Sequence, residues 1–135
     1  MHGTGAHMKW WDPIAPQFSD TAYVLAIDLP GMGDSSHRED YSFESFSKAM
    51  IDILDYEQLI DNEKNIILVG HSLGGHVAGF VATEHPNIVD YLVMIDTPIR
   101  PPDYDYAKHR STGPLRMIKY YEDKLSIVKR LSLIH

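Results

Sequence analysis

The sequence has 135 residues, of which 44 % are hydrophobic and 23 % are charged, and it contains no cysteine. This length and composition predict one globular domain, and the missing cysteine excludes disulfides, thiolate metal sites and cysteine nucleophiles. Twelve Lys and Arg against nineteen Asp and Glu give a net charge of −7, which argues against a nucleic-acid partner because phosphate binding requires a basic face. No apolar run approaches the roughly 20 residues that cross a bilayer, and the start of the chain lacks the features of a secretion signal, so a cytoplasmic protein is expected.

Three short apolar runs predict β-strands. They cover residues 23–27, 66–69 and 91–95, and each is continuous, without polar alternation. This pattern is typical of a parallel strand that is buried on both faces. The spacing of apolar residues predicts an amphipathic helix over 43–60, and a run rich in Gly and Ala predicts a second helix over 73–85. The order strand, helix, strand, helix, strand predicts an α/β fold with right-handed crossovers.

The segment Gly-His-Ser-Leu-Gly-Gly at 70–75 lies directly between a predicted strand and a predicted helix. A serine on so sharp a turn takes a strained conformation with its hydroxyl exposed, and Gly70 and Gly74 leave room for the backbone to pass itself closely. The N–H of Leu73, at the positive end of the helix, points toward the space above Ser72. The alternative is a glycine-rich turn in which Ser72 only caps the helix. The strand-to-helix context favours a nucleophile.

Three segments resemble the α/β-hydrolase family. Residues 70–75 resemble its nucleophile elbow, residues 2–5 (His-Gly-Thr-Gly) resemble the His-Gly segment after its third strand, and residues 28–35 resemble the loop after its fourth strand. The alternative for the His-Gly segment is a loose terminus. The resemblance implies a partial α/β-hydrolase fold, with a core over 1–97, a parallel sheet flanked by helices, and the start of a cap or lid over 98–135.

The resemblance also implies roles for individual residues. Ser72 would attack an acyl carbonyl and form a covalent acyl-enzyme that water hydrolyses, and the N–H groups of Leu73 and Thr4 would form the oxyanion hole. Asp96, after the third predicted strand, is a candidate for the acid, with a plain structural role at the strand end as the alternative. No histidine stands where the family places its base, after an eighth strand. The chain is therefore interpreted as an internal piece of a longer hydrolase, nearly inactive alone because loss of the base costs about 10⁶ in turnover.

A serine rather than an aspartate at the nucleophile position favours acyl chemistry, on a small ester or related carbonyl substrate. No cofactor is expected, and no metal is expected because the histidines lack ligand spacing. A nucleotide-binding domain is disfavoured because Ser36 stands at the third glycine position of a dinucleotide fingerprint. A non-catalytic binding or scaffold domain on the same fold stays open. Neither the substrate nor the oligomeric state follows from the sequence.

Overall fold

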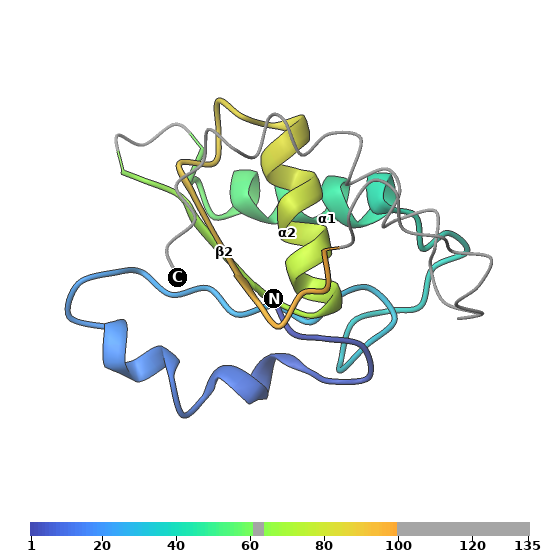
Figure 1. The fold of residues 1–135 in the computed structure, drawn as a ribbon, viewed down its shortest axis with the longest axis horizontal. Helices are drawn as coiled ribbons and strands as arrows, with labels where there is room; N and C mark the ends of the chain where they lie inside the picture. The colour runs from blue at the N-terminus through green and yellow to red at the C-terminus, as the bar shows by residue number, and fades with distance from the viewer. Residues whose placement is uncertain (61–63, 100–135) are drawn as a thin grey trace.

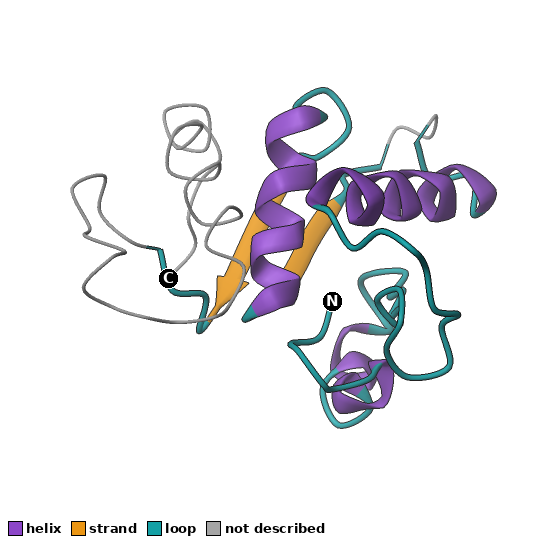
Figure 2. Ribbon diagram, turned by 90° about the vertical axis from the view of Figure 1, so that its right-hand side faces the viewer, coloured by secondary structure: helices purple, strands orange, loops and turns teal. Residues whose placement is uncertain are grey.

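The computed structural model describes residues 1–60 and 64–99. The elements in chain order are two 3-10 helices, η1 (Met8–Trp11) and η2 (Ala15–Phe18), followed by α1 (Phe43–Tyr56), β1 (Ile67–His71), α2 (Leu73–Glu84) and β2 (Tyr91–Ile95). The two strands pair in parallel, with Ile67 opposite Tyr91 and His71 opposite Ile95. Helix α2 packs along this sheet, and α1 packs against α2 (Figures 1 and 2).

The hydrophobic core lies between the sheet and the two helices. Leu68 of β1 and Leu92 of β2 are opposite each other in the register and are both buried, in one cluster with Val77 of α2. Phe43 of α1 stacks on Phe80 of α2 with 5.2 Å between the ring centroids. Helix α2 therefore contacts the sheet on one side and α1 on another, which is why its sequence is apolar and small rather than amphipathic.

Helix α1 begins at Phe43, as the sequence predicts, because the Ser42 side chain accepts a hydrogen bond from the Ser45 N–H and caps the helix. The helix ends at Tyr56 rather than at residue 60. Gln58 has a φ of 55°, a left-handed conformation that an α-helix cannot continue through.

The predicted strand over 23–27 is wrong, since these residues form neither strand nor helix. Tyr23 is 68 % exposed. On the edge of β1 that faces away from β2, the backbone groups of Val69 and His71 bond to Met1: the Met1 nitrogen donates to the Val69 carbonyl at 2.6 Å, and the Met1 carbonyl accepts from the His71 N–H at 3.1 Å. A strand needs a neighbour to pair with, and no further strand lies beside β1 among the described residues.

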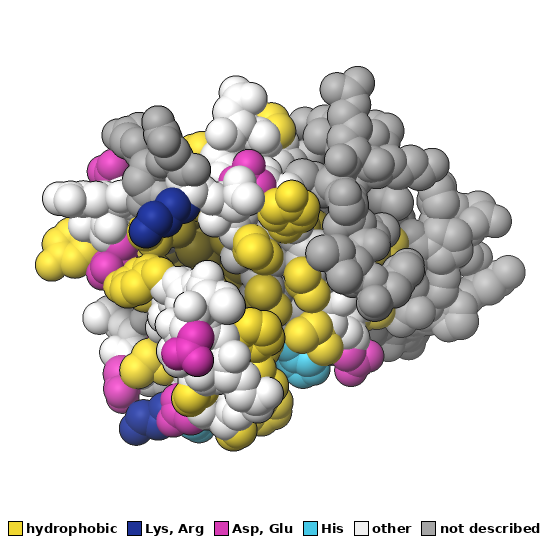
Figure 3. Space-filling model, turned by 90° about the vertical axis from the view of Figure 1, so that its left-hand side faces the viewer, with side chains coloured by type: hydrophobic (Ala, Val, Ile, Leu, Met, Phe, Trp, Pro, Cys, Tyr) yellow, Lys and Arg dark blue, Asp and Glu magenta, His cyan; other side chains and the backbone are white. Residues whose placement is uncertain are grey.

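The expectation that the strands are buried on both faces is also wrong. Ile67, Tyr91 and Ile95 alternate with the buried leucines and are 54, 36 and 42 % exposed. Figure 3 shows hydrophobic side chains gathered across the middle of one face of the molecule. Among the described residues, a helix thus covers one face of the sheet, and side chains on the other face are partly exposed. Within the described residues, no helix is long and apolar enough to cross a membrane, and most of the predicted lid, beyond Ile99, lies outside those residues.

Candidate active site

Ser72 occupies a tight turn between β1 and α2, as the sequence predicts. Its backbone has φ 51° and ψ −116°, a region that costs a non-glycine residue about 1–3 kcal/mol. The turn is held by hydrogen bonds from the Ser72 N–H to the Ile95 carbonyl and from the Gly75 N–H to the Ser72 carbonyl, both 3.0 Å. The Ser72 side chain is half-buried and makes no hydrogen bond that caps the helix. The capping alternative is therefore wrong, and the hydroxyl is left free of the backbone.

The glycines that flank Ser72 are required by close approach of backbone atoms. A Cβ placed on Gly70 would lie 2.2 Å from the carbonyl oxygen of Gly74, and a Cβ on Gly74 would lie 2.5 Å from the carbonyl oxygen of His2. Real Cβ contacts are essentially never this short, so a side chain at either position would displace the backbone. The turn can form only because both positions are glycine.

The amino-terminal segment lies directly against this turn. A Cβ placed on Gly3 would lie 3.2 Å from the Cβ of Ser72 and 2.9 Å from Nδ1 of His71. Met1, His2 and Gly3 are all buried, so the alternative of a loose terminus is wrong. Thr4, which follows, is exposed, and Leu73 is the first residue of α2, where the N–H has no acceptor within the helix. The structure thus brings the two predicted oxyanion-hole segments to the same turn.

Asp28 closes the loop that follows residues 23–27. Its carboxylate accepts hydrogen bonds from the N–H of Asp34 at 2.9 Å and of Met8 at 2.6 Å. The Asp34 N–H lowers the pKa of Asp28 most, partial burial opposes this, and the Met8 N–H lowers it further. A Cβ on Gly33, which has φ 55°, would lie 2.2 Å from the Asp28 carboxyl carbon. These contacts give Asp28 a structural role in holding the loop at 28–34.

Asp96 directly follows β2, at the strand end next to the Ser72 turn. It has a φ of 46°, and its carboxylate is 90 % exposed and lies 3.9 Å from Nε2 of His71. The His71 ring lies 6.2 Å from the ring of Trp10. The sequence did not predict the approach of His71 to Asp96, since no local pattern reports the direction of a side chain on a sharp turn.

Among the described residues, no base is identified by a hydrogen bond to the Ser72 hydroxyl. No histidine within 1–60 and 64–99 hydrogen-bonds the Ser72 hydroxyl. In the same part of the chain, no three His, Asp or Glu side chains come together as a metal site. The described part of the chain therefore brings the Gly3 segment and the first residue of α2 to the turn that carries Ser72.

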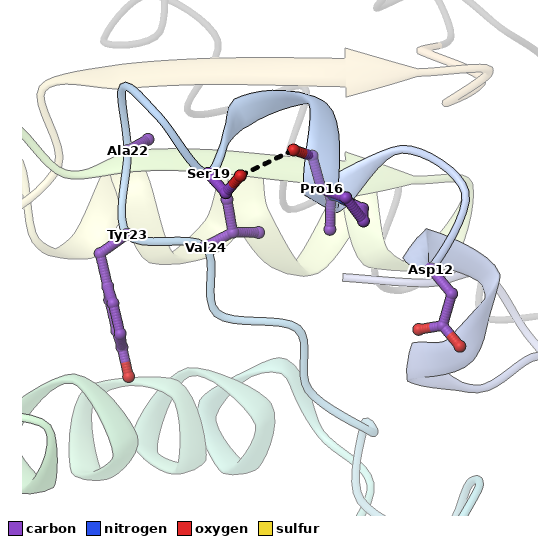
Figure 4. Close-up of a pocket in the computed structure, with 7 residues that line it drawn as sticks. Asp12, Pro16, Ser19, Ala22, Tyr23 and Val24 are labelled. Carbon is purple, nitrogen blue, oxygen red and sulfur yellow. Dashed lines mark hydrogen bonds between the residues drawn. The ribbon is translucent and has the colours of Figure 1, made fainter.

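A hollow of about 480 Å³ lies elsewhere on the molecule. It is formed by residues between 12 and 24, with Tyr23 pointing toward α1 and the Ser19 hydroxyl bonded to the Pro16 carbonyl (Figure 4). Neither Ser72 nor Asp96 lines it. This hollow is open and mostly apolar, and it is not part of the candidate site.

Comparison with known proteins agrees with this geometry. A model of the "Alpha/beta hydrolase family" matches residues 1–129. The chain is 32 % identical over 97 residues to a "Serine hydrolase-like protein" of Danio rerio, covering 72 % of this chain and 29 % of that protein. It is 32 % identical over 99 residues to the "Pimeloyl-[acyl-carrier protein] methyl ester esterase" of Pseudoalteromonas atlantica, covering 72 % of this chain and 35 % of the esterase.

Solved structures show the same similarity. A "Marine microorganism esterase" superposes with a TM-score of 0.69 at 27 % identity, covering 98 % of this chain and 46 % of that one. A thermophilic esterase from Thermogutta terrifontis superposes with a TM-score of 0.68 at 27 % identity, covering 80 % of this chain and 39 % of the esterase. In each comparison this chain spans less than half of the protein it matches.

Proposed function

The chain belongs to the alpha/beta hydrolase family, and on that premise we propose that it forms the nucleophile-bearing part of a serine hydrolase. The observation that carries the proposal is the backbone of Ser72, which holds a left-handed φ of 51° between a strand and a helix. Strain of this kind persists only where the surroundings enforce it. Here the neighbouring glycines and the amino-terminal segment enforce it, and no structural hydrogen bond uses the hydroxyl.

The proposed reaction is acyl transfer to water. Oγ of Ser72 attacks the carbonyl carbon of an ester, the carbonyl oxygen takes the negative charge, and the N–H groups of Leu73 and Thr4 stabilise it. Collapse of this intermediate expels the alcohol and leaves an acyl group on Ser72. Water then attacks the acyl carbon, and the acid is released with Oγ restored.

The proton of the Ser72 hydroxyl must pass to a base, and the described residues place none beside it. We propose that the 135-residue chain alone is nearly inactive for this reaction, since loss of the base costs serine enzymes about 10⁶ in turnover. Residues 98–135 are proposed to begin a lid over the site. The substrate is proposed to be a small carboxylic ester, supported by the two esterases and the methyl ester esterase among the similar proteins.

The role of Ser72 can be tested with a fluorophosphonate probe, which forms a stable bond only with an activated serine. The probe is applied to the protein as the cell makes it, with any residues that it carries beyond these 135. Labelling is expected on the peptide that contains Ser72, and Ser72→Ala is expected to abolish it. Ser19→Ala is the matched control, because the Ser19 hydroxyl bonds only the Pro16 carbonyl at the surface, and it should leave labelling intact.

The alternative is a non-catalytic binding domain on the same fold. A folded protein that takes up no probe at Ser72, or a Ser72→Ala variant that is labelled as well as the unsubstituted protein, would refute the proposed function. The absence of labelling together with a cooperative melting transition would favour the binding domain.

A further inference from the structure

The side chain of His2 is completely buried and lies between two backbone groups. Its Nδ1 is 2.8 Å from the Gly3 carbonyl oxygen, and its Nε2 accepts a hydrogen bond from the Leu29 N–H at 3.0 Å. A nitrogen that accepts a hydrogen bond carries no hydrogen, so in this arrangement the ring hydrogen is on Nδ1 and is donated to Gly3. The carboxylate of Asp28 is 3.6 Å from Nε2, too far for a hydrogen bond, and leaves the Leu29 contact in place.

The Gly3 carbonyl, which accepts the hydrogen bond from His2, belongs to the Gly3–Thr4 peptide. In the proposed reaction, the Thr4 N–H of this peptide faces the Ser72 turn. The Gly3 carbonyl and the Thr4 N–H are parts of one planar trans peptide, so they point in opposite directions. Holding the carbonyl therefore fixes the direction of the N–H. The Gly3 carbonyl also accepts from the Ala6 N–H at 3.2 Å, on the same oxygen as His2.

The Gly3–Thr4 peptide needs these hydrogen bonds to fix its orientation because Gly3 has no side chain. Without a Cβ, Gly3 is free to rotate its backbone through conformations that other residues avoid. A Cβ at this position would lie 2.9 Å from Nδ1 of His71 and 3.2 Å from Cβ of Ser72, so a side chain there would require these neighbours to shift. The segment must therefore keep glycine for space and obtain its rigidity from outside, and the buried imidazole supplies it.

We infer that His2 is a positioning residue for the oxyanion hole: its Nδ1–H holds the Gly3–Thr4 peptide so that the Thr4 N–H points at the developing negative charge. The inference rests on the proposed serine-hydrolase function. Leu29, at the start of the loop at 28–35, fixes the ring through Nε2, so the orientation of the donor is set before substrate binds. Donors aligned in advance stabilise a transition state because they need no reorganisation during the reaction.

Two substitutions separate positioning from stability. His2→Asn places an amide nitrogen near the position of Nδ1 and keeps the donor to Gly3, but it loses the acceptor for Leu29. His2→Gln places an amide oxygen near the position of Nε2 and keeps the acceptor, but it loses the donor to Gly3. Each variant gives up one of two buried hydrogen bonds, so both should lower the melting temperature by similar amounts.

Their effects on catalysis should differ. The measurements are kcat and KM for an activated ester, with the natural protein, and inhibition by a trifluoromethyl ketone, which forms a tetrahedral adduct on the serine. Loss of a complete oxyanion donor costs 10²–10³ in kcat. Because the Ala6 N–H still holds the Gly3 carbonyl, His2→Gln should lower kcat only about tenfold more than His2→Asn. The affinity for the ketone inhibitor should fall by the same factor, and KM should be nearly unchanged. Equal losses of kcat in the two variants would overturn the inference.

Two further observations keep the inference testable. Should both variants unfold, long-range ¹⁵N NMR on the unsubstituted protein decides: a neutral His2 ring with its hydrogen on Nε2 would contradict the inference. The Ser72→Ala protein separates the two proposals. If it retains hydrolysis, the serine-hydrolase function itself fails, whereas if it loses hydrolysis and the His2 variants behave alike, only the role of His2 fails.

Discussion

Two turns follow the two parallel strands, and each holds a non-glycine residue in left-handed backbone. Ser72 has φ 51° and Asp96 has φ 46°. The first turn is enclosed, with its N–H bonded to Ile95 and backbone atoms against Gly70, whereas the carboxylate of the second is 90 % exposed. Asp tolerates this backbone better than most residues, so nothing need enforce it at Asp96. At Ser72 the packing does enforce it, and this is the difference between the turn that we propose to hold a nucleophile and the turn that we expect to have only a structural role.

The largest effect on the free energy of unfolding should come from placing a side chain at Gly70, which packs against the backbone of the Ser72 turn. In Gly70→Ala, the new methyl group would lie 2.2 Å from the Gly74 carbonyl oxygen, and the atoms it meets are backbone atoms that cannot rotate away. We expect a loss of about 3–5 kcal/mol in the free energy of unfolding, or no folded protein at all. Urea unfolding followed by circular dichroism measures this loss.

Gly5→Ala is the matched control for that substitution. Gly5 has φ +70°, but a Cβ there would meet nothing within 4 Å. The control should lose only the left-handed backbone cost of about 1–2 kcal/mol. A Gly70→Ala protein as stable as the control would show that the Ser72 turn is not enclosed, and the contrast with Asp96 would fail.

The Ser72 turn could be predicted from sequence because the glycines that it requires lie within one short motif, between a predicted strand and a predicted helix. The contacts with His2 and Ile95 that also hold the turn come from distant parts of the chain and could not be predicted from this motif. The run 91–95 forms the predicted strand because β1, the preceding strand in the chain, lies beside it in the described part of the molecule.

The features that could not be predicted depend on contacts with residues that are distant in sequence. The run 23–27 has strand composition, but no strand lies beside it within 1–60 and 64–99, and composition alone cannot supply the missing hydrogen bonds. His2 contacts Leu29 across 27 residues, so its ring orientation follows from tertiary packing. The exposure of the Asp96 side chain could not be predicted from the sequence either, because an Asp at a strand end has the same local pattern in a catalytic and in a structural role.

A second prediction uses pH to test the contact between Met1 and the strand that leads into the Ser72 turn. Burial lowers the pKa of the Met1 amino group from 8.0 to about 6. Between these values the unfolded chain binds more protons than the folded chain, so stability rises with pH from about 6 to 8, by at most about 2–3 kcal/mol. Below about pH 6 this contribution is lost. Met1 bonds Val69 and His71, so the loss falls on the strand that leads into Ser72.

The measurement is urea unfolding of the 135-residue chain at several pH values in this window. A chain with acetylated Met1 is the control, because it keeps an N–H and cannot titrate. Its stability should vary less with pH, with a residual slope of the same sign from His76, whose pKa burial also lowers. Identical slopes in the two chains would show that Met1 is not held against β1.

A third prediction compares backbone strain at the two turns. Ser72→Gly should make the protein about 1–2 kcal/mol more stable than Ser72→Ala, because glycine relieves the strain while alanine keeps it. Asp96→Gly should differ from the unsubstituted protein by less than about 0.5 kcal/mol, since the relief at a tolerant Asp is offset by the greater entropy of glycine in the unfolded chain. Thermal unfolding of the four proteins gives the differences. Equal gains at both positions would mean that the packing around Ser72 adds no strain.

The smallest expected effect is that of Asp96→Asn on hydrolysis. Asparagine keeps the shape and the tolerance for left-handed backbone, and it removes only the charge. Where an aspartate orients the catalytic base, its replacement by asparagine lowers the kcat of the enzyme by about 10⁴. The Asp96 carboxylate instead lies in solvent, 3.9 Å from a histidine that does not bond Ser72, so we expect kcat for an activated ester to change less than about threefold, as for a surface group. A loss of a thousandfold or more would make Asp96 the acid and would place both turns in the catalytic machinery.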